Sequence, residues 1–326
     1  MRCAALSLGM VLGGSMLLGG CSANPVSGKN ELALMSESDE IATGRQAHQQ
    51  LLTQNPAYAD AAVQAYVNRI GQTMAVQSHR NNLPYTFTVL DDATVNAFAL
   101  PGGYVYVTTG LLAYLNSEAE LAGVLGHEIG HVAARHNVSQ ASWGAVGDIA
   151  TKILSEKLGN AELIGTLSNL TLRKYGRDQE LEADGLAAEY LSRAGYDPAA
   201  MVNVIATLQA YDQLSGGTSE PYRDLLSTHP SNDQRLQQLI AQARQFGGGS
   251  RDPGHDSYLR QIEGLRLPAG NNRTVQIRLL TAKAGDSFAT LAQTSPLRNA
   301  TMQLRVLNGL FPTGEPNPGQ LLKTVE

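Results

Sequence analysis

The chain has 326 residues, of which 43% are hydrophobic and 16% are charged, and its formal net charge is −5. A chain of this length buries one large core or divides into a main domain and a smaller one. Its weakly acidic balance excludes the basic surface that nucleic-acid binding requires, and no acidic block marks a disordered tail. We therefore expect a folded protein without a nucleic-acid partner.

The first residues are typical of an export signal. A basic residue precedes an apolar run at 4–20, which is short for a membrane span and ends in small residues. The end of this run, Leu-Gly-Gly-Cys21, resembles the bacterial lipobox, in which the cysteine is lipidated and becomes the mature N-terminus. We expect a lipoprotein signal peptide at 1–20, a lipid on Cys21 and a polar tether at 21–35. The alternatives are a plain signal peptide or an uncleaved anchor.

Cys21 and the residue after it also indicate where in the cell the protein is located. Without residues 1–20 it is the only cysteine, so the exported protein has no internal disulfide. Ser22, rather than an aspartate, follows it and favours the outer membrane. We expect a periplasmic protein of a Gram-negative bacterium, anchored by lipid to the inner face of the outer membrane.

Two helices and a small sheet begin the folded part. Ser36 and the acidic residues after it are typical of a helix start, and apolar residues at 63–74 recur at helical spacing. Alternating β-branched and aromatic residues at 85–90 and 104–108 predict strands. The Pro-Gly-Gly sequence at 101–103 predicts a turn, so we expect a small antiparallel sheet with a hairpin there.

The rest of the chain is predicted to be mostly helical. Ser117 and Glu120 have capping-box spacing and begin a helix whose apolar pattern continues to Val132. Further helices are expected in the segments 139–172, 178–193, 197–208 and 229–239. A glycine-rich linker and a short helix are expected at 246–273, followed by a small α+β module at 274–326. The predicted fold class is therefore α+β, with a mainly helical domain at 36–245.

The predicted helix from Ser117 carries His127-Glu128-Ile129-Gly130-His131, which has the form H-E-x-x-H. Histidines four residues apart lie on one helical face and can share one Zn²⁺, with the glutamate beside the water of the metal. The alternative is a helix in which two histidines merely flank a glutamate.

A catalytic zinc needs a third protein ligand, and an acidic cluster supplies candidates. Glu180 and Asp184 are four residues apart, so one can bind the metal while the other accepts a hydrogen bond from a ligand histidine. Spacing alone does not separate Glu180 from Glu182, and acidic residues on a helix are often only solvated.

Four motifs in chain order resemble those of the Ste-type CAAX-protease and HtpX-like zinc metallopeptidases. They are Asn-Ala-Phe-Ala-Leu-Pro-Gly-Gly at 96–103, H-E-x-x-H at 127–131, R-x-x-E-x-x-A-D at 177–184 and H-P-x-x-x-x-R at 229–235. The resemblance implies a zincin-like fold of the gluzincin type that holds one Zn²⁺ through His127, His131 and Glu180. It also implies that Asp184 hydrogen-bonds a ligand, outside the metal's own shell.

The same resemblance suggests roles for three more residues. His229 would assist catalysis or occupy the fourth zinc position in a resting state, whereas alone it is an ordinary loop histidine. Arg235 would orient His229 or the acids and help to bind substrate, the alternative being a surface arginine. Asn96 lies where an extended substrate could add to the sheet edge. The other histidines, His136 among them, show no pattern and are expected at the surface.

The expected function is that of a zinc-dependent endopeptidase of the cell envelope, acting on misfolded or unassembled proteins. Glu128 would take a proton from the zinc-bound water as that water attacks the scissile carbonyl. One alternative is a chaperone-like factor for outer-membrane protein assembly, with a mostly blocked zinc site. Another is a cell-wall-binding protein, because 274–326 resembles a LysM-like fold and could contact peptidoglycan, although it could equally be a packing or spacer module. Unlike the membrane-embedded members, the chain shows no transmembrane helix after the signal.

Overall fold

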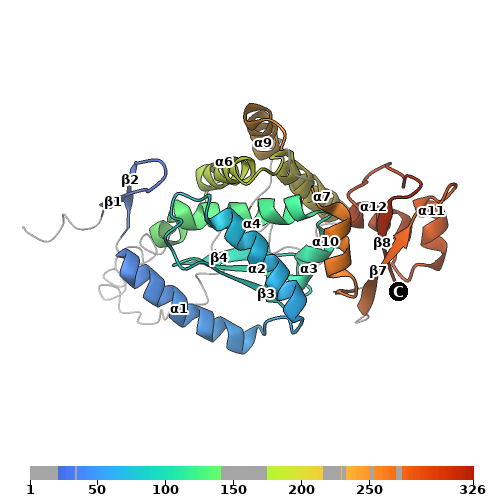
Figure 1. Cartoon of the computed structure of the whole chain (residues 1–326), viewed down its shortest axis with the longest axis horizontal. Coiled ribbons are helices and arrows are strands. Elements are labelled where there is room, and N and C mark those ends of the chain that lie inside the picture. The colour runs from blue at the N-terminus through green and yellow to red at the C-terminus, as the bar shows by residue number, and fades with distance from the viewer. Residues whose placement is uncertain are drawn as a thin grey trace, which may run out of the picture.

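The computed structural model describes residues 21–33, 35–140, 175–215, 229, 233–249, 253–268 and 274–326. The predicted signal peptide and nearly all of the helical segment predicted at 139–172 lie outside these residues. The described residues are mainly helical with three small sheets, which confirms the α+β class (Figure 1). None of their helices is both long enough and apolar enough to cross a membrane.

The N-terminal part contains a small hairpin and two helices. The segment expected to be a tether contains two paired antiparallel strands, β1 (Cys21–Ala23) and β2 (Asn30–Leu32). Helix α1 (Glu37–Gln54) begins at Ser36 as predicted, because the Ser36 side chain accepts a hydrogen bond from the Asp39 backbone. Helix α2 (Ala61–Ala75) buries its apolar face in the core.

The central sheet has the strand order β3-β5-β4. The turn at 101–103 joins β4 (Ala97–Leu100) to β5 (Tyr104–Thr108) as the predicted antiparallel hairpin, and its two glycines have positive φ. However, β3 (Thr86–Leu90) pairs with β5 in parallel, so the prediction of a purely antiparallel sheet was wrong. The physical reason is that the chain crosses from β3 to the far edge, and the hairpin then returns β5 between β3 and β4.

Helix α4 (Glu118–Ala133) lies at the centre of the molecule, and every one of its residues is buried (Figure 1). Its start is the predicted one, because Ser117 accepts a hydrogen bond from the Glu120 backbone at 3.1 Å. The Glu120 carboxylate accepts from the backbone of Asn116, one residue earlier than in the usual capping box. Short helix α3 (Thr109–Tyr114) precedes α4.

Four helices surround the central one or follow it. Helix α4 packs against α2, α6 (Arg177–Arg193) and α7 (Ala199–Ser215), while α9 (Asp233–Phe246) packs on α6. Helix α6 can approach closely because Gly130 of α4 has no side chain. A Cβ there would lie only 3.2 Å from the Cα of Ala183. This close contact brings the acidic residues of α6 beside the histidines of α4.

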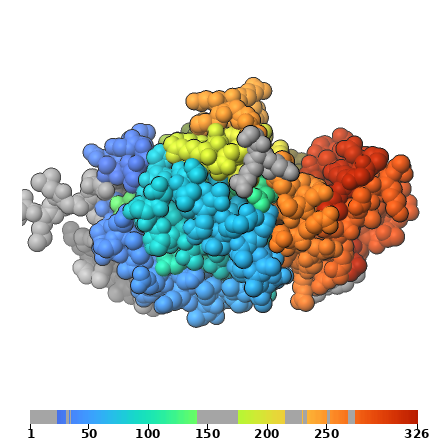
Figure 2. Space-filling view, viewed as in Figure 1, coloured from blue at the N-terminus to red at the C-terminus, as the bar shows by residue number. Residues whose placement is uncertain are grey.

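The C-terminal part, orange and red in Figure 2, adjoins the helical domain at one end of the molecule. It contains a third sheet with the strand order β6-β7-β8. Helix α10 (His255–Ile262) leads to β6 (Arg266–Pro268) and β7 (Thr274–Thr281). Helix α11 (Phe288–Leu291), a 3₁₀ turn (Ala292–Thr294), helix α12 (Ala300–Leu307) and strand β8 (Leu321–Val325) follow. The strands β6 and β8 were not predicted.

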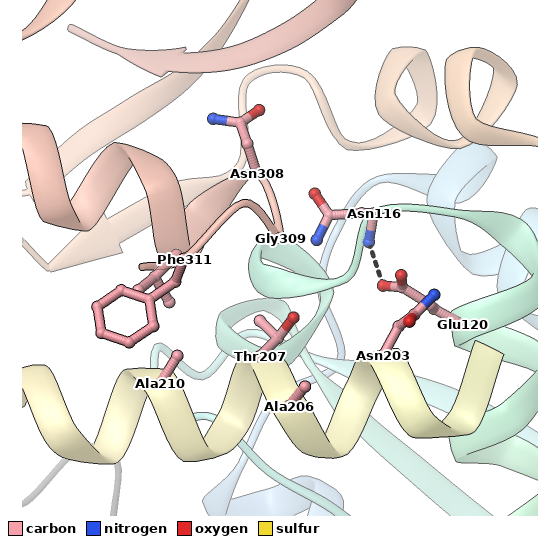
Figure 3. A pocket seen from close by; sticks show the side chains of 10 residues that line it. Asn116, Glu120, Asn203, Ala206, Thr207, Ala210, Asn308, Gly309 and Phe311 are labelled. Atoms are coloured by element: carbon pink, nitrogen blue, oxygen red, sulfur yellow. Dashed lines mark hydrogen bonds between the residues drawn. The ribbon is translucent and has the colours of Figure 1, made fainter. Parts of the chain in front are cut away.

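Lys323 of β8 connects the C-terminal part to the helices that precede the metal-binding motif. Its side chain is fully buried, and its ammonium donates to the carbonyl oxygens of Ala113 at 2.8 Å and Leu115 at 2.7 Å. A pocket of about 200 Å³ lies beside this contact, between α7 and the end of α12; Figure 3 shows its lining, including Asn116 and Glu120. Burial lowers the pKa of Lys323, and the charge of Glu120 partly restores it.

Replacing Lys323 with methionine should lower the free energy of unfolding by about 3 kcal/mol, because Glu120 and two carbonyls then stay buried without their cation. Urea unfolding measures this change. The exposed Lys283→Met is the matched control and should change the free energy of unfolding by no more than about 0.5 kcal/mol. Equal stabilities of the two variants would show that the Lys323 contact contributes nothing.

Candidate metal centre

The two histidines of the H-E-x-x-H motif lie on one face of α4. Their Nε2 atoms are 3.1 Å apart, and both side chains are buried. Burial lowers the pKa of His131 well below its ordinary value, so its ring is neutral and has a lone pair for a metal.

Helix α6 adds a carboxylate to this pair. Oxygens of Glu180 lie 3.5 Å from His131 Nε2 and 3.6 Å from His127 Nε2. Glu182 instead points to His136, with a separation of 3.1 Å. The structure thereby separates the two glutamates that spacing left equivalent.

His229 supplies a fourth donor. Its Nδ1 atom lies 2.9 Å from Glu180 Oε1 and 3.3 Å from His127 Nε2. The four donor atoms of His127, His131, Glu180 and His229 all lie within 4.8 Å of one another. His229 is therefore buried in the cluster and is not a surface loop histidine.

These four donors fit one zinc ion. Ligand atoms at about 2.0–2.1 Å from a tetrahedral Zn²⁺ lie about 3.3 Å from one another, close to the separations between these donors. The surrounding charge also fits. Glu128, Glu180 and Asp184 are three buried carboxylates, and Arg235 is a single guanidinium among them. A dication would balance the two negative charges that remain when all three are ionised.

Asp184 and Arg235 hold the donors in place. Asp184 Oδ1 lies 2.9 Å from His127 Nδ1, so this carboxylate favours the tautomer with the proton on Nδ1 and the lone pair on His127 Nε2. Arg235 donates to both oxygens of Asp184 at 2.8 Å, and its Nη1 is 2.7 Å from Glu180 Oε2. Burial favours a raised pKa for Asp184, but the bonds from Arg235 and His127 outweigh it and lower the pKa. Arg235 is only 2% exposed, so it is not a surface arginine.

Glu128 lies beside the donor cluster. Its Oε1 atom is 3.6 Å from His229 Nε2, and its Oε2 atom has no hydrogen-bond partner among the described residues. Burial raises the pKa of Glu128, which makes its carboxylate a stronger base than an exposed one. A small cavity of about 30 Å³ borders Glu128, His127 and His229, and its other walls are Arg235 and apolar side chains of α4 and α7. It has room for a water molecule.

Two neighbours of the donors were missed by the sequence analysis. His136 was expected at the surface but is fully buried, with its Nδ1 atom 2.9 Å from His131 Nδ1. The ring of Tyr175 stacks on His131 with the centroids 3.8 Å apart. No periodicity connects these residues with α4. The left-handed backbone of Arg135, with φ of 59°, turns the chain back after the helix and places His136 under His131.

Asn96 and Cys21 lie apart from this cluster. Asn96 directly precedes the edge strand β4, and its backbone N–H and C=O both bond to Thr108. In the described part of the chain, none of its hydrogen bonds reaches the four donors. Cys21 is the first residue of β1.

Comparison with known proteins shows which family and which relatives the chain is similar to. The family model for peptidase family M48 matches residues 61–243. The chain is 31% identical over 234 residues to a beta-barrel assembly-enhancing protease of Yersinia pestis, which covers 68% of this chain and 47% of that protein. It is 30% identical over 257 residues to the Escherichia coli K12 protein of the same name, covering 74% and 52%. With the mitochondrial metalloendopeptidase OMA1 of Arabidopsis thaliana the identity is 35% over 188 residues, covering 56% and 36%.

The chain spans about half the length of the two bacterial relatives. The family match covers more than half of this chain and contains all four donors, Glu128, Asp184 and Arg235. The chain therefore belongs to peptidase family M48.

Proposed function

We propose that this chain is a zinc-dependent endopeptidase of the bacterial cell envelope, hydrolysing peptide bonds in misfolded or unassembled proteins. One observation carries the proposal: a carboxylate oxygen of Glu128 is buried beside four metal donors and has no partner in the described structure. A site that only bound metal would gain nothing from such a group, whose burial costs free energy. A hydrolytic site needs it as a base.

His127, His131 and Glu180 would hold the metal, and His229 would fill the fourth position in a resting state. Zn²⁺, when bound, polarises a carbonyl and lowers the pKa of its water to about 7. Glu128, with its pKa raised by burial, takes a proton from the attacking water and later gives one to the leaving amine. Asp184 keeps His127 in the tautomer that can bind metal, and Arg235 orients both acids.

His229 has a second property that suits this role. Burial lowers its pKa, but the nearby carboxylates of Glu180 and Glu128 outweigh burial, so the pKa lies above the ordinary value. Away from the metal, His229 would be a cation beside the acids and could stabilise the oxyanion of the attacked carbonyl. Its place among the donors also favours the second candidate, an assembly factor whose zinc site is mostly blocked.

The proposal also covers the cellular location of the protein and the role of the small C-terminal module at 274–326. The signal at 1–20 and a lipid on Cys21 would anchor the protein to the inner face of the outer membrane. The names of the bacterial relatives, beta-barrel assembly-enhancing proteases, support an envelope role. Residues 274–326 would be a LysM-like module. The burial of Lys323 against α3 supports a packing role for it ahead of peptidoglycan contact.

Removing the metal tests the proposed function. Dialysis against dipicolinate should reduce the cleavage of fluorescent casein to background, and one equivalent of Zn²⁺ per chain should restore it. Magnesium is the control, because it prefers oxygen ligands and octahedral geometry and should restore nothing. Undiminished cleavage by the zinc-free protein would contradict the proposal. Zinc binding without any cleavage would favour the blocked assembly factor.

A further inference from the structure

A chain of three side chains leads from the donor cluster toward the surface. The Nδ1 atom of His131 lies 2.9 Å from His136 Nδ1, and His136 Nε2 lies 3.1 Å from Glu182 Oε2. The side chain of His136 is 1% exposed, whereas that of Glu182 is 25% exposed. His136 thus has a partner at each nitrogen, which a packing residue does not require.

The acceptors in this chain fix where the protons lie. Glu182 is a partly exposed carboxylate whose Oε2 atom lies 3.1 Å from His136 Nε2, and the oxygens of a carboxylate accept hydrogen bonds. In the tautomer of His136 that donates from Nε2 to this carboxylate, the lone pair lies on Nδ1. That lone pair can accept a hydrogen bond from the Nδ1–H of His131, 2.9 Å away. His131 Nε2, which faces His127 and Glu180, is left as a free lone pair.

The same result is reached independently at the other histidine of the motif. Asp184 Oδ1 lies 2.9 Å from His127 Nδ1, and a proton on that nitrogen would leave the lone pair on His127 Nε2. In each of the two rings, the nitrogen that faces away from the metal site is therefore linked to a carboxylate. For His127 the carboxylate is direct, and for His131 it acts through a second histidine. Asp184 was expected from the resemblance, but nothing in the sequence indicated the path through His136.

We propose that His136 and Glu182 are positioning residues that hold His131 as its Nδ1–H tautomer, with its ring aimed at the metal. The left-handed turn at Arg135 places His136, and Arg135 is itself held by Glu40 at 3.1 Å and by the backbone oxygen of Met35 at 2.7 Å. This inference rests on the proposed zinc site. Loss of such an outer partner weakens metal binding by roughly 10- to 100-fold.

A pair of variants at one position separates positioning from packing. His136→Gln keeps an acceptor for the proton of His131, whereas His136→Leu has similar bulk and no acceptor. The dissociation constant for Zn²⁺ is measured by competition with a chelating indicator on the full chain. We expect His136→Leu to bind zinc roughly 10- to 100-fold more weakly than wild type, and His136→Gln to recover most of that loss. Equal losses in both variants would overturn the proposal.

Glu182 gives a second test that does not disturb the core, because its side chain is partly exposed. Glu182→Ala should weaken zinc binding by roughly 10-fold. The control Glu189→Gln lies on the same helix, and its ion pair with Arg193 is remote from the donors, so it should bind like wild type. Wild-type affinity in Glu182→Ala would overturn the relay, and so would an equal loss in the control. Failure of the wild-type chain itself to bind zinc would overturn the proposed function as well, so the two failures are distinguishable.

Nitrogen-15 NMR of the zinc-loaded protein reads the tautomer directly. In wild type, His131 should show a protonated Nδ1 and a metal-bound Nε2, with the Nδ1 proton protected from exchange. In His136→Leu this proton should exchange faster, because it has lost its acceptor. An unchanged signal and exchange rate in that variant would contradict the positioning role.

Discussion

Replacing Glu128 with glutamine should lower the rate of casein cleavage by about 100- to 10,000-fold and leave zinc binding within a few-fold of wild type. Glutamine has almost the same shape but cannot take up a proton. Glu128 is also not one of the four clustered donors, and its Oε2 atom bonds to no described residue, so the substitution breaks no contact of that oxygen. The measurements are initial rates with fluorescent casein and zinc content by mass spectrometry.

The control for this variant is Glu263→Gln, an exposed position outside the metal centre, which should keep wild-type activity. Persistent cleavage by a folded, zinc-loaded Glu128→Gln protein would show that another group is the base. Loss of zinc together with activity would mean that Glu128 contributes to the donor set.

The central helix could be predicted because its signals are local. Ser117 and Glu120 mark the start of α4, and the apolar pattern continues through the two histidines. The parallel pairing of β3 with β5 could not be predicted from the sequence. It depends on the edge of the sheet to which the chain crosses before the hairpin. Strand β8 was missed because its Lys323 looks like a surface residue, and only the carbonyls of α3 explain its burial.

The residues of the candidate site also differ in whether the sequence could indicate them. His127 and His131 follow from helical spacing, and the resemblance singled out Glu180, whose carboxylate the structure places beside both rings. His136 could not be found, because the left-handed residue Arg135 ends the helical register that relates sequence spacing to direction. Likewise, spacing indicates nothing about the burial of Arg235, since its two carboxylate partners come from α6, some fifty residues earlier.

Replacing Arg235 with methionine should lower the free energy of unfolding of the metal-free protein by about 3–5 kcal/mol at pH 7. The change leaves Asp184 and Glu180 buried without the guanidinium that contacts both. Arg235→Lys should lie between methionine and wild type, because a single ammonium cannot bond both oxygens of Asp184 in the planar geometry of a guanidinium. Urea unfolding in the presence of a chelator measures all three proteins, and the exposed Arg244→Met on the same helix is the control.

The pH dependence of this loss identifies its cause. In wild type, the bonds from Arg235 help to lower the pKa of Asp184 below its unfolded value, so this group stabilises the fold above about pH 4 and ceases to do so as the pH falls. In Arg235→Met, the largest of the groups that oppose burial is lost, so the pKa of Asp184 should rise relative to wild type. If this rise takes the pKa above its unfolded value, the folded variant binds protons more readily than its unfolded chain, and we expect the difference in stability from wild type to be largest at pH 7 and smaller at pH 5. A difference of the same size at both pH values would mean that Arg235 acts through packing of its aliphatic stem and not through its charge.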